Sequence, residues 1–130
     1  DTNIALDLLV FDDPGCAALL AALDLGELQW IATAAMREEL ARVLRYPLVA
    51  ARLARNGRDA ALVLAAFDRR VLPVDEAPAR APCLCRDPDD QVFVDLAVAQ
   101  RARLLSKDRA LLEMRGPLAR LGVEVAVPGG

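Results

Sequence analysis

Two spacings of apolar residues recur along the chain, one typical of helices and one typical of short strands. Segments with the helical spacing are separated by glycine, proline or acidic residues of the kind that begin and end helices. We predict helices over 16–25, 34–44, 48–55 and 59–69, from Pro88 onward, and over 110–114, with a further turn over 118–121. Short apolar runs predict strands over 28–33, 71–74, 104–105 and 123–127.

The order of these elements predicts an α/β fold. Strands alternate with helices, which favours right-handed crossovers and a parallel sheet covered by helices on both faces. Thr33 is placed to cap the helix over 34–44, and Gly116-Pro117 is placed to break a helix near the C-terminus. The proline-containing segment 75–82 is expected to be a loop.

The apolar stripe of each helix predicts which of its side chains are buried. The set expected to face inward from the helix over 34–44 is Met36, Leu40, Val43 and Leu44. The corresponding set in the helix over 59–69 is Leu62, Val63, Ala66 and Phe67. In the helix after Pro88 it is Val92, Phe93, Leu96, Ala97 and Val98. Asp95 lies among these apolar residues and is interpreted as a solvated or capping acid.

Length and composition favour one domain with a single core, covering residues 1–130. Apolar residues make up 55% of the chain, yet charges interrupt every apolar run before it reaches the roughly 18 residues of a membrane-spanning helix. No signal-peptide pattern is present either. We therefore expect no membrane association and a cytoplasmic location.

Histidine is absent, which excludes catalysis by serine–histidine or cysteine–histidine pairs and by a histidine general base. The three cysteines, Cys16, Cys83 and Cys85, lack the spacing of a zinc site or a disulfide framework, and we interpret them as buried or idle thiols. The net charge of −3 excludes a globally basic nucleic-acid-binding protein but leaves a local basic patch open.

Four acids are expected to meet at one edge of the predicted sheet. Asp108 follows the strand over 104–105, Asp90 begins the preceding helix, Glu39 lies early in the helix after the strand over 28–33, and Asp1 occupies the presumed end of a first strand. Each acid alone is ordinary, because acids are common in the first turn of a helix. Together they would repel one another unless a cation lay between them. Oxygen ligands without histidine or thiolate favour Mg²⁺ or Mn²⁺.

Three motifs carry a resemblance to a known family. They are Asp1-Thr2-Asn3, the segment EELARVLRYP over 38–47, and RDPDDQVFVDLAVAQRARLLSKDRALL over 86–112. In this order and at these separations the sequence resembles PIN-domain proteins over essentially its whole length, close to the VapC-type toxins of bacterial toxin–antitoxin pairs. The resemblance implies a three-layer α/β/α fold with a central parallel sheet. The first strand of that sheet is missing from the printed chain, so we expect several apolar residues before Asp1 in the gene product.

The resemblance also implies a site and an activity. Asp1, Glu39, Asp90 and Asp108 would hold one or two Mg²⁺ or Mn²⁺ ions for hydrolysis of RNA by an in-line attack of water. The adjacent Asp89 is the alternative to Asp90 as third ligand. The residues expected to steady the carboxylates or a metal-bound water are Asn3, Ser106 and Asp89. The arginines expected to meet RNA phosphates are Arg86, Arg37 and Arg42.

The expected partners follow from the same resemblance: RNA as substrate, a cognate antitoxin protein, and a second copy of the chain. The apolar surface of 16–25 or 48–67 is the expected dimer interface. The main alternative is a non-catalytic PIN fold that binds RNA or a protein. A phosphoacceptor receiver domain is disfavoured because no isolated aspartate ends a middle strand. A haloacid-type phosphatase is disfavoured because Asp1-Thr2-Asn3 lacks the second aspartate of the D-x-D motif.

Overall fold

The computed structural model describes residues 1–129 of the chain. Contacts among the residues divide it into two units. The N-terminal unit comprises Thr2 and residues 4–75, and the C-terminal unit comprises Asp1, Asn3 and the residues from Glu76 onward. Each unit combines helices with a pair of parallel strands, so the fold is α/β as predicted. Within residues 1–129, no helix is both long and apolar enough to cross a bilayer.

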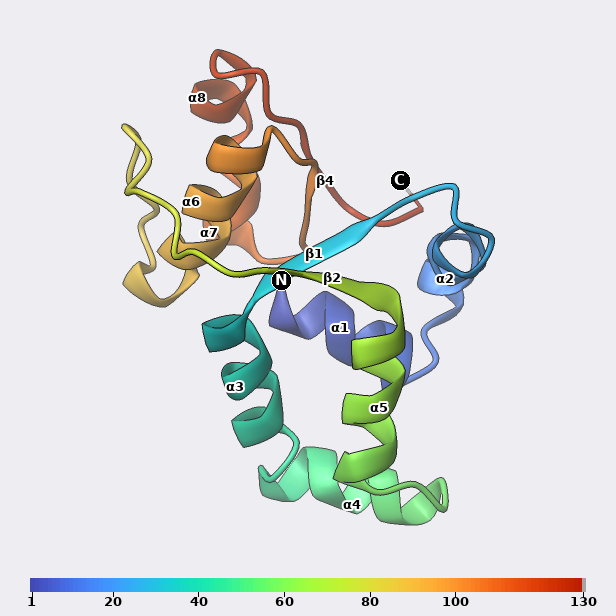
Figure 1. The fold of residues 1–130 in the computed structure, drawn as a ribbon. Helices are drawn as coiled ribbons and strands as arrows, with labels where there is room; N and C mark the ends of the chain where they lie inside the picture. The colour runs from blue at the N-terminus through green and yellow to red at the C-terminus, as the bar shows by residue number, and fades with distance from the viewer. Residues whose placement is uncertain (130) are drawn as a thin grey trace. The chain divides into compact units, whose positions relative to one another are not determined.

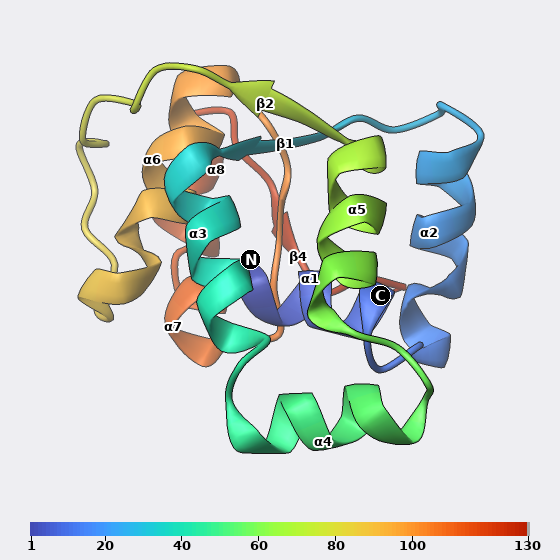
Figure 2. The ribbon, with the colours of Figure 1, turned by 60° about the horizontal axis from the view of Figure 1, so that its bottom comes forward.

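The helices and strands of the N-terminal unit follow one another along the chain as α1 (Thr2–Leu9), a short 3-10 helix (Pro14–Cys16), α2 (Ala17–Asp24), β1 (Trp30–Thr33), α3 (Ala34–Val43), α4 (Pro47–Arg55), α5 (Ala60–Arg70) and β2 (Val71–Val74). Strands β1 and β2 are parallel, with Trp30 opposite Val71 (Figure 1). Helix α4 joins the far ends of α3 and α5, as Figure 2 also shows. The predicted strands and helices from 28 to 74 are thus confirmed to within two residues.

Local sequence explains where these helices begin. Thr33 Oγ1 accepts a hydrogen bond from the backbone N–H of Met36 at 3.3 Å, and Asp59 Oδ1 accepts one from Leu62 at 2.8 Å. Pro47 begins α4, where the missing N–H has no helical partner to lose. The core of this unit includes an edge-to-face contact between the rings of Trp30 and Phe67, 5.2 Å apart.

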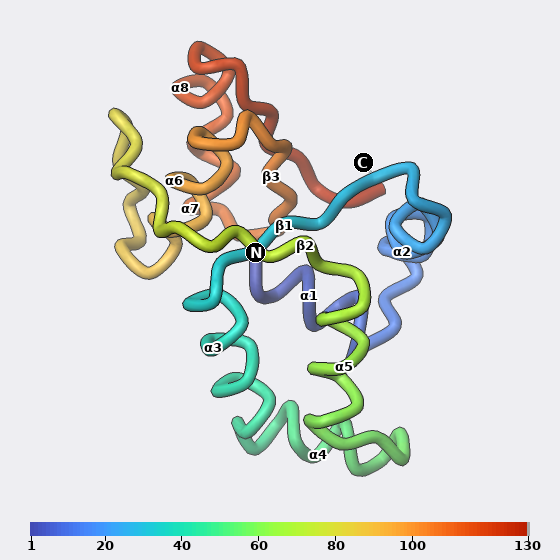
Figure 3. Tube along the Cα trace, in the orientation of Figure 1, coloured from blue at the N-terminus to red at the C-terminus, as the bar shows by residue number. Residues whose placement is uncertain are grey.

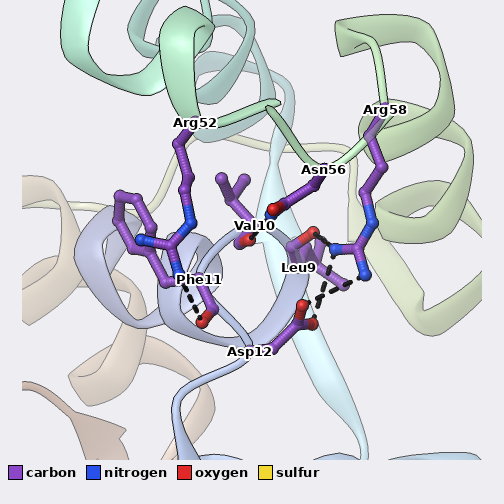
Figure 4. A network of polar contacts seen from close by, with 7 residues as sticks. All are labelled: Leu9, Val10, Phe11, Asp12, Arg52, Asn56 and Arg58. Atoms are coloured by element: carbon purple, nitrogen blue, oxygen red, sulfur yellow. Dashed lines mark hydrogen bonds and ion pairs between the residues drawn. The ribbon is translucent and has the colours of Figure 1, made fainter. Parts of the chain in front are cut away.

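Polar side chains from α4 and the loop after it bind the backbone at the end of α1 and just beyond it (Figure 4). Arg58 Nη1 donates to Leu9 O at 3.1 Å, Asn56 Nδ2 to Val10 O at 3.3 Å, and Arg52 Nη2 to Phe11 O at 3.5 Å. The last carbonyls of a helix lack helical partners, and Leu9 and Val10 are buried. These donors therefore replace the water that the carbonyls lose on folding, and Arg58 also pairs with Asp12 at 3.1 Å.

The C-terminal unit contains a 3-10 turn (Pro88–Asp90), α6 (Gln91–Gln100), β3 (Leu104–Leu105), α7 (Arg109–Leu112), α8 (Arg115–Ala119) and β4 (Val125–Ala126). Figure 3 traces α6, β3 and α7 in succession. Strands β3 and β4 are parallel, with Leu104 opposite Val125. The segment 75–82 is a loop, as predicted, and the irregular chain continues to the turn at Pro88.

Four details of the sequence prediction were wrong. Leu62 is 58% exposed and Val92 42% exposed, because the buried faces of α5 and α6 are centred on neighbouring residues. Asp95 is buried rather than solvated, since two hydrogen-bond donors surround its carboxylate. Gly116-Pro117 lies inside α8 and does not break a helix, because both residues fall in its first turn, where an N–H is not needed.

Candidate functional site

Three carboxylates of the C-terminal unit gather where α6 and α7 begin. One oxygen each of Asp87, Asp90 and Asp108 lies within 4.8 Å of the others, and all three side chains are half-buried. Asp87 precedes the 3-10 turn, Asp90 ends that turn at the start of α6, and Asp108 follows β3. Asp108 therefore lies just beyond the end of β3, and the other two acids lie before α6.

Backbone hydrogen bonds fix two of these carboxylates. Asp87 Oδ1 accepts from the N–H of Asp89 at 3.0 Å, and Asp108 Oδ1 accepts from the N–H of Ala110 at 3.0 Å. Both aspartates thus cap the helical turn that follows them. Each uses one oxygen as a cap, so its second oxygen stays available for other bonds.

Ser106 connects this cluster with Asp1. Its hydroxyl is fully buried, accepts from the N–H of Asp108 at 2.9 Å and donates to Asp1 Oδ2 at 2.5 Å. The backbone nitrogen of Asp1 also donates to Leu105 O at 2.9 Å. A single hydroxyl therefore orients the Asp1 carboxylate and the backbone of Asp108 together.

The electrostatics show how closely the acids approach. The pKa of Asp108 is lowered, first by a hydrogen bond with the Asp90 carboxyl, then by the Ala110 N–H and the nearby charge of Arg86, against the opposing effect of burial. A lowered pKa favours the charged form, so Asp108 keeps its negative charge beside Asp90. Burial, followed by these acids, raises the pKa of the neighbouring Cys85 thiol.

The structure brings together only part of the site expected from the sequence. Asp1, Ser106, Asp90 and Asp108 lie in the C-terminal unit, whereas Glu39 lies half-buried on α3 of the N-terminal unit. Asp89 is exposed and outside the group of three carboxylates, and Asn3 is exposed on α1.

The three arginines expected to bind RNA are in different surroundings. Arg86 forms an exposed ion pair with Glu113 at 3.3 Å. Arg37 makes two hydrogen bonds to Asp68, at 2.8 and 2.9 Å, which lower the pKa of that carboxyl. Arg42 is exposed in the last turn of α3. Of the three, Arg86 alone shares a unit with the carboxylate cluster.

Sequence reasoning did not place Asp87 in the site, although its signal was present. An aspartate directly before a proline that opens a helical turn is a strong candidate for an N-cap, and capping points its carboxylate toward the turn. Asp90 lies in the same turn, so the cap also turns Asp87 toward Asp90. The motif Asp-Pro-Asp-Asp therefore supplies two members of the cluster.

The donor set fits a hard divalent cation. All three side chains offer oxygen, and a cation would offset the repulsion between carboxylates that lie this close together. A second group, Asp7, Asp13 and Cys16 in the N-terminal unit, mixes carboxylates with a buried thiol. It lacks the uniform hard-oxygen chemistry of the first group, so Mg²⁺ or Mn²⁺ fits the cluster around Asp108 better.

Comparison with known proteins identifies the family. A PIN domain family model matches residues 1–110, which include Asp1, Glu39 and every member of the carboxylate cluster. Neither the curated proteins nor the solved structures gave a match. PIN domains are generally metal-dependent nucleases, in agreement with a cluster of carboxylates that could bind metal. The chain belongs to the PIN domain family.

Proposed function

We propose that this chain is a divalent-metal-dependent ribonuclease that cleaves RNA endonucleolytically. The observation that carries the proposal is the group of three carboxylates within 4.8 Å, inside the region matched by the family. The three-layer α/β/α arrangement with one central parallel sheet is part of the same proposal and rests on the family resemblance.

Asp87, Asp90 and Asp108 would hold the cation through one oxygen each, and Asp1 joins them through Ser106. Glu39 completes the ligand set in this proposal on the strength of its motif over 38–47. The bound cation, Mg²⁺ or Mn²⁺, would lower the pKa of a water and offset charge on the attacked phosphate.

The protein's own side chains contribute orientation and charge. The Ser106 hydroxyl holds Asp1 and the Asp108 backbone in one arrangement, so little reorganisation is needed at the site. Arg86 is the leading candidate to bind a phosphate, because its pair with Glu113 is exposed and such pairs contribute only about 1 kcal/mol or less. Arg42 is proposed as a further contact, and Arg37 would have to exchange Asp68 for a phosphate.

Metal removal tests the reaction directly. We expect the purified chain to cleave single-stranded RNA in millimolar Mg²⁺ or Mn²⁺, to lose that activity in a chelator, and to regain it when either metal is restored. Internal fragments of an end-labelled RNA would identify endonucleolytic cleavage. RNA binding without cleavage under all these conditions would contradict the proposal and support the non-catalytic PIN fold.

Within this proposal the chain acts as the toxin of a toxin–antitoxin pair, in the cytoplasm of a bacterium. The support is the resemblance of the three motifs to VapC-type toxins. The partner would be an antitoxin protein encoded by a short upstream open reading frame with a DNA-binding start. Its absence from the gene neighbourhood would count against the toxin role.

We also propose a homodimer, with α2 as part of the interface. Helix α2 consists of alanine, leucine and one aspartate, yet none of its residues is buried, and the following Leu25 is 74% exposed. Such an apolar helix gains free energy when a second copy covers it. We expect a dimer mass by light scattering at tens of micromolar and a shift toward monomer in Leu25→Glu. A monomer mass for the unmodified chain would contradict this.

A further inference from the structure

Residues 81–85, which contain no helix or strand, are bound to α6 by two buried side chains. Gln91 and Asp95, 5% and 8% exposed, lie one helical turn apart. Gln91 Oε1 accepts a hydrogen bond from the backbone N–H of Cys85 at 2.6 Å, and Gln91 Nε2 donates to Cys83 O at 3.1 Å. Asp95 Oδ1 accepts two hydrogen bonds, from Gln91 Nε2 at 2.9 Å and from the backbone N–H of Ala81 at 2.8 Å.

These bonds hold the acidic turn at both of its ends. The turn runs from residue 86 to 90 and carries Asp87 and Asp90. Gln91 follows the turn directly, and the same side chain binds the N–H of Cys85, which precedes the turn. The spatial relation of Asp87 to the start of α6 therefore depends on the Gln91 side chain, and Asp95 in turn orients the Gln91 amide.

Stability alone does not account for these residue types. A buried amide and a buried carboxylate lose their hydration, and the hydrogen bonds that replace it contribute only a modest net free energy of folding. Aliphatic side chains at these positions would therefore stabilise the buried face of α6 as well or better. What the polar pair adds is a defined position for three backbone groups of residues 81–85.

We propose that Gln91 and Asp95 are positioning residues of the metal centre, which hold residues 81–85 on α6 so that Asp87 is presented to Asp90 and Asp108. The inference rests on the proposed function. Neither residue belongs to the carboxylate cluster, and Asp95 acts as a hydrogen-bond acceptor.

The variants separate this role from simple stabilisation. Both bonds to Asp95 reach the same oxygen, Oδ1, so Asp95→Asn can keep them, whereas Asp95→Leu removes both. Gln91→Glu keeps an acceptor for Cys85 N but loses the donor for Cys83 O and Asp95. Leu118→Ala is the matched control, because Leu118 is fully buried in the same unit and outside the turn.

The measurement is Mn²⁺ affinity by titration calorimetry on the full chain, well below each variant's melting temperature, together with the labelling rate of buried Cys85. We expect Asp95→Leu and Gln91→Glu to weaken Mn²⁺ binding by roughly 10- to 100-fold and to accelerate labelling of Cys85. Asp95→Asn and Leu118→Ala should keep an Mn²⁺ affinity and a labelling rate close to those of the unmodified chain. Labelling needs no metal, so it reports on residues 81–85 alone.

Three results would overturn the positioning role: unchanged Mn²⁺ affinity in Asp95→Leu, an equal loss in Leu118→Ala at a matched melting temperature, or an equal loss in Asp95→Asn. If the unmodified chain binds no Mn²⁺, the metal centre and this inference both fail. If it binds Mn²⁺ with the expected variant pattern but cleaves no RNA, the nuclease proposal fails and the positioning role stands.

Discussion

Replacing Asp108 with asparagine is expected to reduce metal-dependent RNA cleavage by about 100-fold or more, beyond the loss typical of residues that only support a ligand. Asparagine keeps the size of the side chain and an oxygen that can accept from the Ala110 N–H, so the cap of α7 is retained. What is lost is the negative charge that helps to hold a divalent cation. Initial cleavage rates at saturating RNA, with melting temperature measured in parallel, would show a loss of activity without unfolding.

Neighbouring acids provide the controls for this substitution. Asp87→Asn also retains its cap and should lose activity, because Asp87 belongs to the cluster. Asp89→Asn should lose much less, since Asp89 is exposed and outside that group. Glu124→Gln, an exposed acid of the same unit, should leave the rate unchanged. A rate for Asp108→Asn within a few fold of the unmodified chain would rule out Asp108 as a metal ligand.

Local signals in the sequence predicted the parts of the fold that depend on nearby residues. The Thr33 cap and the short apolar runs of β1 and β2 act over a few positions, and the structure confirms them. The placement of Asp108 directly after β3 followed from the same reasoning. Such features depend on backbone geometry that the residues themselves impose.

Long-range contacts explain what the sequence could not reveal. Asp95 is buried because a backbone N–H fourteen residues earlier needs an acceptor, and no spacing within α6 signals that need. Leu62 and Val92 have the helical spacing of core residues, but which face of a helix is covered depends on elements distant in sequence. The three-layer sheet and the place of Glu39 in the site remain predictions for the same reason.

The proximity of Asp90 and Asp108 has a thermodynamic consequence. In the absence of metal, Asp87, Asp90 and Asp108 each place a carboxylate oxygen within 4.8 Å of the others. Ionising neighbouring acids at this distance costs free energy of folding. A divalent cation removes this cost because it supplies the positive charge.

Millimolar Mg²⁺ or Mn²⁺ is therefore expected to raise the melting temperature of the unmodified chain, by preferential binding to the folded state. Stabilisation reaches about 2.7 kcal/mol when the free metal concentration is a hundred times Kd, which corresponds to a shift of about 10 °C for a chain of this size. Asp90→Asn should melt higher than the unmodified chain in a chelator, since its neutral amide removes one negative charge from the crowded cluster. The same variant should lose most of the metal-dependent shift.

Thermal melts of the unmodified chain, Asp90→Asn, Asp108→Asn and Glu124→Gln, each with chelator and with metal, make the comparison complete. Glu124→Gln should keep the full shift, because this side chain is exposed and outside the cluster. The expectation fails if Asp90→Asn and Asp108→Asn melt lower than the unmodified chain in chelator and still respond to metal. That pattern would mean that the cation binds elsewhere and that the two aspartates only stabilise the fold, Asp108 as the cap of α7.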